Sequence, residues 1–201
     1  MNKYSEITPY SIENPEHLKS ALMDAGLPID KWGEGPTKTY LDLWNEIAEG
    51  ESEMICPQTF ETRSEYGEII RQTNVLGIDV YAESDGKVYR LKEEKQVFNN
   101  GRGERKRELL TSLAEKIKLD ENHEQAVLRA VEEELGVLNL DSLYKTDDVE
   151  LWKTTPTYPE LPSKLMIYCY AVIIADSDFD PSGYVENQPT KQVFFTWDRL
   201  Y

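Results

Sequence analysis

The sequence predicts an α+β fold, and three observations carry this prediction. Residues 14–51 show a helical pattern of apolar positions, whereas the chain beyond Cys56 contains short apolar stretches with little helical period. One amphipathic segment, residues 121–135, has strand candidates on both sides of it. Strands that flank a single strong helix are typical of an α+β domain or of a sandwich with α/β/α layers.

The size and charge of the chain limit what it can be. Its 201 residues suit one domain of ordinary size, or one domain with an added helical lobe, and 39% hydrophobic residues are enough for a core. The 38 Asp and Glu residues outnumber the 22 Lys and Arg residues, so the formal net charge is −16. Such a surface repels phosphate backbones at long range. We therefore expect no non-specific nucleic-acid binding. The net charge does not exclude a local basic pocket.

The sequence also lacks the marks of export or membrane insertion. Residues 1–12 contain no basic segment followed by an apolar stretch, which a signal peptide would need. The longest apolar run, residues 165–175, is far shorter than the roughly 20 residues that cross a bilayer. Cys56 and Cys169 lie among apolar residues, which favours two reduced core thiols over a disulfide. We expect a soluble cytoplasmic protein without a membrane partner.

Two helices are predicted in the N-terminal region. Pro15 suits the first turn of a helix that starts after Asn14 and ends near Gly26. A second helix is predicted over residues 38–48, with its apolar residues on one side. The simplest interpretation of this lobe is that it only packs on the rest of the chain. A role in dimerisation or in docking a partner is the alternative.

Strand signals dominate the remainder of the chain. Residues 74–83 are apolar, Ser84-Asp85-Gly86 marks a turn and residues 87–98 alternate, so we expect a β-hairpin. Gly136 would end the helix at residues 121–135. Further strands are expected at residues 109–117, 149–154, 165–175 and 192–197.

The predicted helix at residues 121–135 carries the most informative chemistry. Glu133 and Glu134 lie on adjoining edges of an apolar stripe that is formed by positions 126, 127, 130, 131 and 134. Carboxylates beside an apolar seam can hold a hard divalent cation such as Mg²⁺. The alternative is a Glu-rich surface helix on which Arg129 pairs with neighbouring acids.

The spacing of these residues resembles the Nudix box, the motif G-x5-E-x7-R-E-U-x-E-E-x-G-U, in which U is a bulky aliphatic residue. Seven of its nine specified positions match, namely Glu121, Arg129, Val131, Glu133, Glu134, Gly136 and Val137. Glu115 stands where the motif opens with glycine, and Ala130 stands where it has an acid. The chain thus resembles the Nudix hydrolase superfamily, with an atypical box.

The order of the predicted elements extends this resemblance to about residues 72–197. A late strand ends in Phe194-Phe195-Thr196-Trp197, and some family members carry a further metal-binding or catalytic glutamate in the loop before that strand. Glu186 is the matching candidate here. The resemblance implies a Nudix-like α/β/α sandwich with a mixed β-sheet at residues 56–201, preceded by an N-terminal helical extension at residues 1–55.

The family resemblance implies a hydrolase that acts on the pyrophosphate bond of a nucleoside diphosphate linked to another moiety. Mg²⁺ or Mn²⁺ would offset the substrate's charge and acidify the attacking water, while a carboxylate takes its proton. Carried over by position, Glu133 and Glu134 would be metal ligands and catalytic groups, and Glu186 an auxiliary catalytic group. Glu121, Arg129 and Gly136 would support the site.

The two departures from the motif favour a second hypothesis. The methyl group of Ala130 cannot ligate a cation, so fewer charges would remain to hold one. Glu115 could compensate, or it could be an exposed loop charge, and it replaces a glycine that permits positive φ. The alternative function is a Nudix-fold module that binds a nucleotide or another partner without efficient catalysis. A homodimer is one further option.

A basic island interrupts the acidic chain and favours a phosphate ligand. It consists of Arg102, Arg105, Lys106, Arg107, Lys116 and Lys118. Because a guanidinium can bind phosphate oxygens bidentately, we expect Arg102, Arg105 and Arg107 to contact a small nucleotide-type substrate. The alternative is a solvated loop of mixed charge, since Glu104 and Glu108 lie between these residues.

Overall fold

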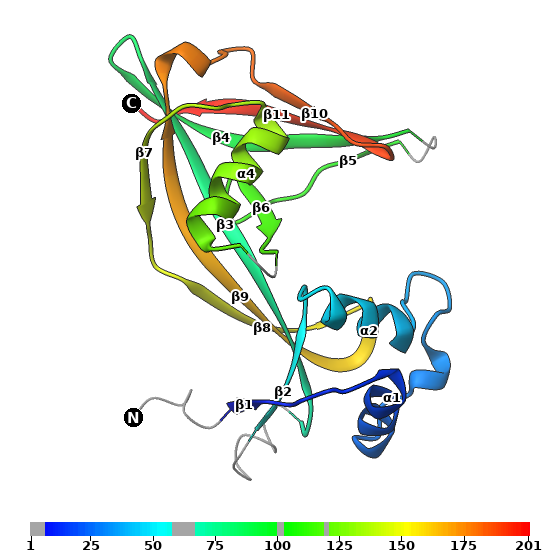
Figure 1. Ribbon diagram of the computed structural model, residues 1–201. Coiled ribbons are helices and arrows are strands. Elements are labelled where there is room, and N and C mark those ends of the chain that lie inside the picture. The colour runs from blue at the N-terminus through cyan, green and yellow to red at the C-terminus, as the bar shows by residue number, and fades with distance from the viewer. Residues whose placement is uncertain (1–6, 58–66, 100–102, 119–120) are drawn as a thin grey trace. The chain divides into compact units, whose positions relative to one another are not determined.

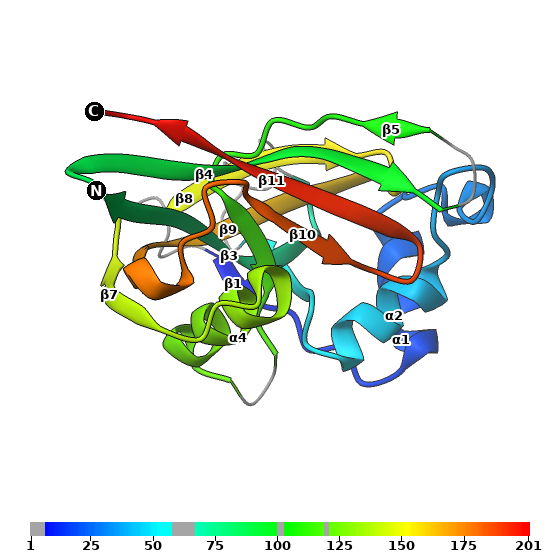
Figure 2. The same ribbon diagram turned by 90° about the horizontal axis from the view of Figure 1, so that it is seen from above.

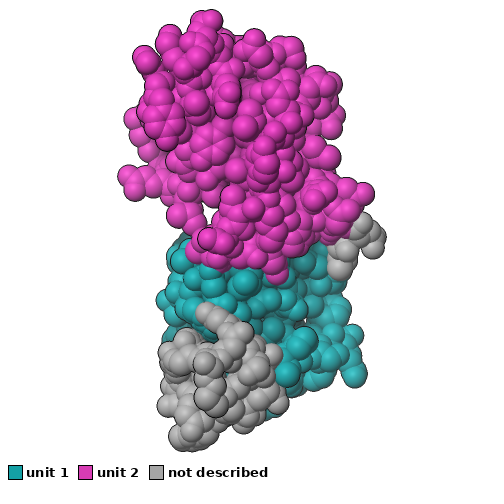
Figure 3. Space-filling view, turned by 90° about the vertical axis from the view of Figure 1, so that its left-hand side faces the viewer, with its two compact units in different colours: residues 1–74, 150–166 teal, residues 75–149, 167–201 magenta. Residues whose placement is uncertain are grey.

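The computed structural model describes residues 7–57, 67–99, 103–118 and 121–201 (Figure 1). The chain divides into two compact units, coloured in Figure 3: unit 1 comprises residues 1–74 and 150–166, and unit 2 comprises residues 75–149 and 167–201. Two long strands, β3 (Ile70–Ser84) and β9 (Tyr158–Ile174), contribute residues to both units. The domain boundary predicted after residue 55 stays a prediction, since compactness alone does not define a functional domain.

Unit 1 contains both helices predicted for the N-terminal region. The side chain of Asn14 accepts a hydrogen bond of 2.9 Å from the backbone N–H of His17 and caps α1 (Pro15–Asp24). Thr39 and Asp42 form a capping box at the start of α2 (Tyr40–Ala48). A short 3₁₀ helix, η2 (Ile29–Lys31), lies between them along the chain. Both predicted helices are therefore present, and each begins at a side-chain cap.

The helices of unit 1 share a core with its strands. Strand β2 (Glu53–Pro57) pairs antiparallel with β1 (Ile7–Pro9) and with the first residues of β3. The apolar sides of the helices are buried with residues from β2 and β9, in a cluster that includes Leu18, Leu22, Trp32, Leu43, Met54 and Tyr158. The sequence pattern did not predict β1.

Unit 2 is organised around antiparallel strand pairs. Asp85 and Gly86, with φ of 51° and 67°, turn β3 into β4 (Lys87–Phe98), which confirms the predicted hairpin. Strand β4 also pairs with β11 (Lys191–Arg199), and β11 pairs with β10 (Tyr184–Asn187). Residues 75–78 of β3 pair with β6 (Leu113–Lys116).

The remaining elements of unit 2 attach to these strands. The two-residue strand β5 (Glu104–Arg105) pairs with β4, and β7 (Leu140–Lys145) pairs with the second part of β9. Strand β8 (Val149–Thr155) also pairs with β9, but all of its residues except Val149 belong to unit 1. A 3₁₀ helix, η3 (Asp176–Asp178), follows β9 along the chain.

Helix α4 (His123–Leu135) is the predicted amphipathic helix. Asn122 and Gln125 form a capping box at its start, and Gly136 ends it with a left-handed φ of 70°. Its apolar side is fully buried in the core of unit 2 through residues that include Ala126, Val127, Ala130 and Val131. The helix contacts β6 (Figure 1) and β10 (Figure 2). These two strands and α4 together position the candidate site.

The α+β class is confirmed, with two corrections to the predicted elements. The strand expected at residues 109–117 is limited to Leu113–Lys116. The segment around Glu186, predicted as a loop, is strand β10, because the backbone of residues 184–187 pairs with that of residues 192–195 in β11. No helix in the described part of the chain is long and apolar enough to cross a membrane.

Candidate active site

Among the described carboxyl groups of unit 2, Glu134 has the most strongly shifted pKa. It is half-buried near the end of α4, and its pKa is raised to about 8. Burial is the largest cause of this rise, and the negative charges of Glu186, Glu115 and Glu93 add to it. Only Arg107 acts in the opposite direction among the main contributions. The surroundings of Glu134 therefore favour a proton or another positive charge on it.

The carboxylates that act on Glu134 come from strands on which α4 packs. Glu115 lies in β6, and the backbone N–H of Lys116 donates a hydrogen bond of 2.9 Å to it. Glu186 lies in β10 and accepts hydrogen bonds of 2.8 and 2.9 Å from the side-chain amide of Gln188. Glu115 and Glu186, from the neighbouring element β6 and the distant strand β10, are thus placed where their charges act on Glu134.

Arg107 brings one cation of the basic island to this acidic region. Its Nε lies 2.8 Å from each carboxylate oxygen of Glu93 in β4, and its Nη2 lies 2.5 Å from one of them. The side chain of Glu93 is only 1% exposed, whereas that of Arg107 is 36% exposed. Glu93 thus holds a partly accessible guanidinium whose charge reaches Glu134.

The other candidate phosphate-binding arginines are placed differently. Arg105 is exposed on β5. Arg102 lies outside the described residues, so its predicted contact with substrate stays a prediction. The sequence analysis missed Glu93 as a site residue, because its pairing with Arg107 depends on the position of β4 in the fold.

Arg129 and Glu121 connect α4 to the segment before it. Arg129 donates hydrogen bonds of 2.8 and 3.0 Å to the two oxygens of Glu121, and a third of 3.0 Å to the carbonyl oxygen of Lys116. The hydrogen bonds from Arg129 lower the pKa of Glu121. Arg129 thus links α4 to Glu121 and to the backbone at the end of β6, and the role of this pair in supporting a site stays a prediction.

Glu133 does not share the surroundings of Glu134. Its side chain is 55% exposed, and one of its oxygens accepts a hydrogen bond of 2.9 Å from Nη1 of Arg129. Its other oxygen lies 3.8 Å from the ammonium of Lys118. The two neighbouring glutamates of the motif are thus used differently, and the role of Glu133 as a metal ligand stays a prediction.

Ala130 occupies a fully buried position in an apolar environment. It is 0% exposed and belongs to the apolar cluster that joins α4 to strands β3, β4 and β9. A glutamate there would bury a carboxylate among apolar side chains, which costs far more than a methyl group does. Simple replacement of Ala130 by Glu is therefore expected to damage the core. Glu115 provides an acid to the region from the neighbouring strand instead.

The chemistry of these donors suits a hard divalent cation, since Mg²⁺ and Mn²⁺ prefer carboxylate oxygens. Mg²⁺ keeps several waters and needs few direct protein ligands. Within residues 7–57, 67–99, 103–118 and 121–201, however, no three acidic, His or Cys side chains are already arranged as a metal-binding group. The donors suit a cation by charge and atom type, but the described side chains form no ready ligand group, so the metal site stays a prediction.

Comparison with known proteins gives a result for the structure only. No model of a known protein family matches the sequence, and no characterised protein matches it in a sequence search. Among solved structures the matches have low sequence identity and low TM-scores. An Ap4A hydrolase from C. elegans is 13% identical, with 62% of this chain and 77% of that chain covered and a TM-score of 0.32.

Two bacterial structures give similar values. The E. coli dihydroneopterin triphosphate pyrophosphohydrolase is 12% identical, with 62% of this chain and 78% of that chain covered and a TM-score of 0.37. The NUDIX domain of Shewanella oneidensis NrtR, solved with ADP ribose, is 14% identical, with 63% and 71% covered and a TM-score of 0.32. Because these superpositions are partial, the function proposed below rests on the chain's own residues.

Proposed function

We propose that this chain is a Nudix-type hydrolase that cleaves the pyrophosphate bond of a nucleoside diphosphate linked to another moiety. The observation that supports this function most is Glu134, whose pKa is raised to about 8 among the acids Glu186 and Glu115. A carboxyl group with a pKa near neutrality can take and return a proton at physiological pH. Such groups concentrate at functional sites.

The arrangement of charges fits a pyrophosphate substrate together with a cation. Glu134, Glu186 and Glu115 would hold Mg²⁺ or Mn²⁺, which when bound would offset the charge of the phosphate oxygens and acidify a water molecule. Glu134 would orient that water and accept its proton. The guanidinium of Arg107 would bind a phosphate oxygen at the edge of the acidic group. Glu121 and Arg129 would keep α4 in place.

The test is hydrolysis of a panel of linked nucleoside diphosphates with Mg²⁺ and with Mn²⁺. Wild type, Glu134→Gln and Glu132→Gln are assayed in parallel, because Glu132 is an exposed glutamate on the same helix and makes the matched control. Glu134→Gln should lower kcat by roughly 100-fold or more, the range expected when a general base is lost. Glu132→Gln should keep wild-type activity.

Each result decides one part of the proposal. A substrate that only wild type and Glu132→Gln hydrolyse would support a working site around Glu134 and would name the substrate class. Turnover that survives in Glu134→Gln would place the chemistry elsewhere and contradict the proposal.

A binding module without catalysis is the second candidate, and two observations favour it. Ala130 is fully buried, and Glu133 is engaged by Arg129, so fewer acids are available than in the complete motif. This candidate predicts that a nucleotide stabilises the protein in thermal unfolding without being hydrolysed under any metal condition. Metal-dependent turnover that Glu134→Gln removes would exclude it.

A further inference from the structure

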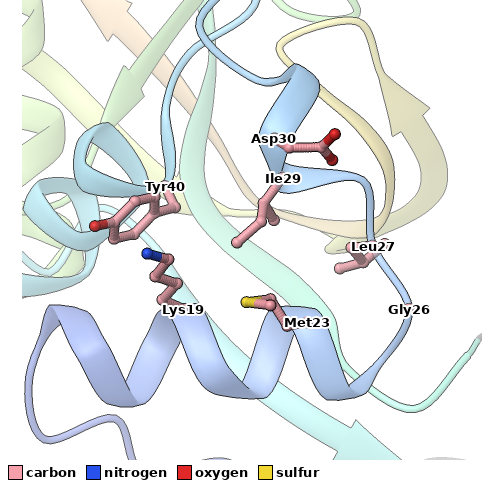
Figure 4. A pocket seen from close by; sticks show the side chains of 7 residues that line it. All are labelled: Lys19, Met23, Gly26, Leu27, Ile29, Asp30 and Tyr40. Carbon is pink, nitrogen blue, oxygen red and sulfur yellow. The ribbon is translucent and has the colours of Figure 1, made fainter.

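Unit 1 contains a cavity that has no part in the proposed hydrolysis. Its volume is about 610 Å³, and it lies between α1, the turn that follows it, η2 and the start of α2 (Figure 4). The lining side chains that define its chemistry are Lys19, Met23, Leu27, Ile29, Asp30 and Tyr40. All of them belong to unit 1, whereas Glu134 and the acids that act on it belong to unit 2.

The body of this cavity is apolar. Met23 extends from α1 towards Ile29, and the ring of Tyr40 forms another part of the wall (Figure 4). Met23 is a large hydrophobic side chain that is nevertheless 57% exposed. A cavity of this size and composition is in the range that small organic ligands occupy in proteins, roughly 300 to 1,000 Å³.

One cation lies at the wall of this cavity. The ammonium of Lys19 is 5.5 Å from the centre of the Tyr40 ring, and both side chains face the same space (Figure 4). Within the described part of the chain no carboxylate forms an ion pair with Lys19, and Asp30 directs its carboxylate away from it (Figure 4). The charge of Lys19 is therefore available to an anion at the wall of the cavity.

We propose that this cavity binds a small amphipathic anion. The apolar body of the ligand packs against Met23, Leu27 and Ile29, and its carboxylate or other acidic group pairs with the ammonium of Lys19. The same ammonium lies 5.5 Å from the centre of the Tyr40 ring, so a ligand in the cavity would meet the ring and the charge together. This site is independent of the hydrolase function, because it shares no residue with the region around Glu134.

The test uses 8-anilinonaphthalene-1-sulfonate, an aromatic anion whose fluorescence rises on transfer to an apolar site. Wild type is titrated beside Lys19→Met, which keeps the length of the side chain and removes its charge. Lys153→Met is the matched control, because Lys153 is an exposed lysine of the same unit that does not line the cavity. We expect one site per chain, and binding that is roughly tenfold weaker in Lys19→Met only.

Competition tests the two halves of the ligand separately. Decanoate should displace the dye from wild type, whereas decanol, which has the same apolar chain but no charge, should displace it far less. Met23→Glu places a negative charge at an exposed position of the cavity wall, where it would repel the anionic dye. It should therefore weaken binding of the dye, as Lys19→Met does. The proposal is overturned if wild type gives no saturable site, if Lys19→Met and Lys153→Met bind the dye equally, or if decanol competes as well as decanoate.

Discussion

Glu46 in unit 1 and Glu134 in unit 2 are both carried by helices and both are drawn away from water, yet their pKa values move in opposite directions. That of Glu46 falls to about 2, and that of Glu134 rises to about 8. Glu46 is the more buried of the two residues, with 5% of its surface exposed. Burial by itself raises the pKa of any carboxyl group, so the difference lies in the partners.

Glu46 is surrounded by donors. One of its oxygens lies 2.7 Å from the ammonium of Lys38 and 2.9 Å from the hydroxyl of Tyr158, and the other lies 2.7 Å from Nη2 of Arg71. Ser52 donates a further hydrogen bond of 3.2 Å. Burial acts to raise the pKa of Glu46, but these donors and the charge of Arg71 outweigh it. The negative charge of Glu46 is thus compensated by groups that all belong to unit 1.

Glu134 has acids where Glu46 has donors. Burial and the charges of Glu186, Glu115 and Glu93 all raise its pKa, and Arg107 opposes them only in part. A buried carboxylate with a complete set of donors stabilises a fold. The negative charge of one placed among other acids is uncompensated until a proton, a cation or a ligand binds. This comparison assigns a structural role to Glu46 and supports a functional one for Glu134.

The largest effect on stability is expected from Glu46→Gln. The neutral amide leaves Arg71 and Lys38 without their buried counter-charge, and removal of one partner of such a network costs about 3 kcal/mol. Urea unfolding at pH 7 measures the loss. Glu49→Gln, an exposed position just after the same helix, is the control and should change the free energy of unfolding by less than about 0.5 kcal/mol.

The same variant carries a pH signature. Because the pKa of Glu46 is lowered from 4.5 to about 2 on folding, its stabilisation is complete above pH 4.5 and is lost as the pH falls towards 2. The difference between wild type and Glu46→Gln should therefore shrink over that window. A difference that stays constant down to pH 2 would show that the loss comes from packing rather than from charge.

Glu134→Gln should act in the opposite sense and stabilise the protein. The pKa of Glu134 is raised from 4.5 to about 8, so its ionisation opposes folding as the pH rises through this window. The gain from an uncharged amide should be absent below pH 4.5 and on the order of 2 kcal/mol above pH 8, without added metal. Thermal unfolding from pH 5 to 9 measures it, with Glu132→Gln as the control. Loss of stability at pH 9 would contradict the charge assignment.

Local signals were sufficient to predict much of the fold. Asn14 and Gly136 mark helix ends by their own backbone and side-chain preferences, and Asp85-Gly86 specifies its turn in the same way. The spacing of Glu121 and Arg129 predicted residues that do lie in contact. These features depend on short stretches of chain, which is why the sequence discloses them.

Features that depend on contacts between distant segments were not predictable. Position 130 looked like a missing ligand, but the strands packed against α4 make it a core position. Glu46 looked like one of many helical acids, and its partners Arg71 and Tyr158 lie 25 and 112 residues further along the chain. The pairing of Arg107 with Glu93 depends in the same way on the strand that buries Glu93.

The smallest of the expected effects comes from Tyr158→Phe, and it tests whether the donors around Glu46 act individually. Tyr158 is 0% exposed, so the phenyl ring should keep its packing while the hydrogen bond of 2.9 Å to Glu46 is lost. We expect a loss of about 1 kcal/mol at pH 7 in urea unfolding. Tyr144→Phe, at a position that is 55% exposed, should leave stability unchanged.

The acid side of the same unfolding curve makes the Tyr158→Phe result specific. With one donor fewer, the pKa of Glu46 should move up from about 2, so the acid-induced loss of stability should begin at a higher pH than in wild type. An equal loss at all pH values would mean that the hydroxyl stabilises unit 1 without acting on the charge of Glu46. In that case Lys38 and Arg71 alone would distinguish Glu46 from Glu134.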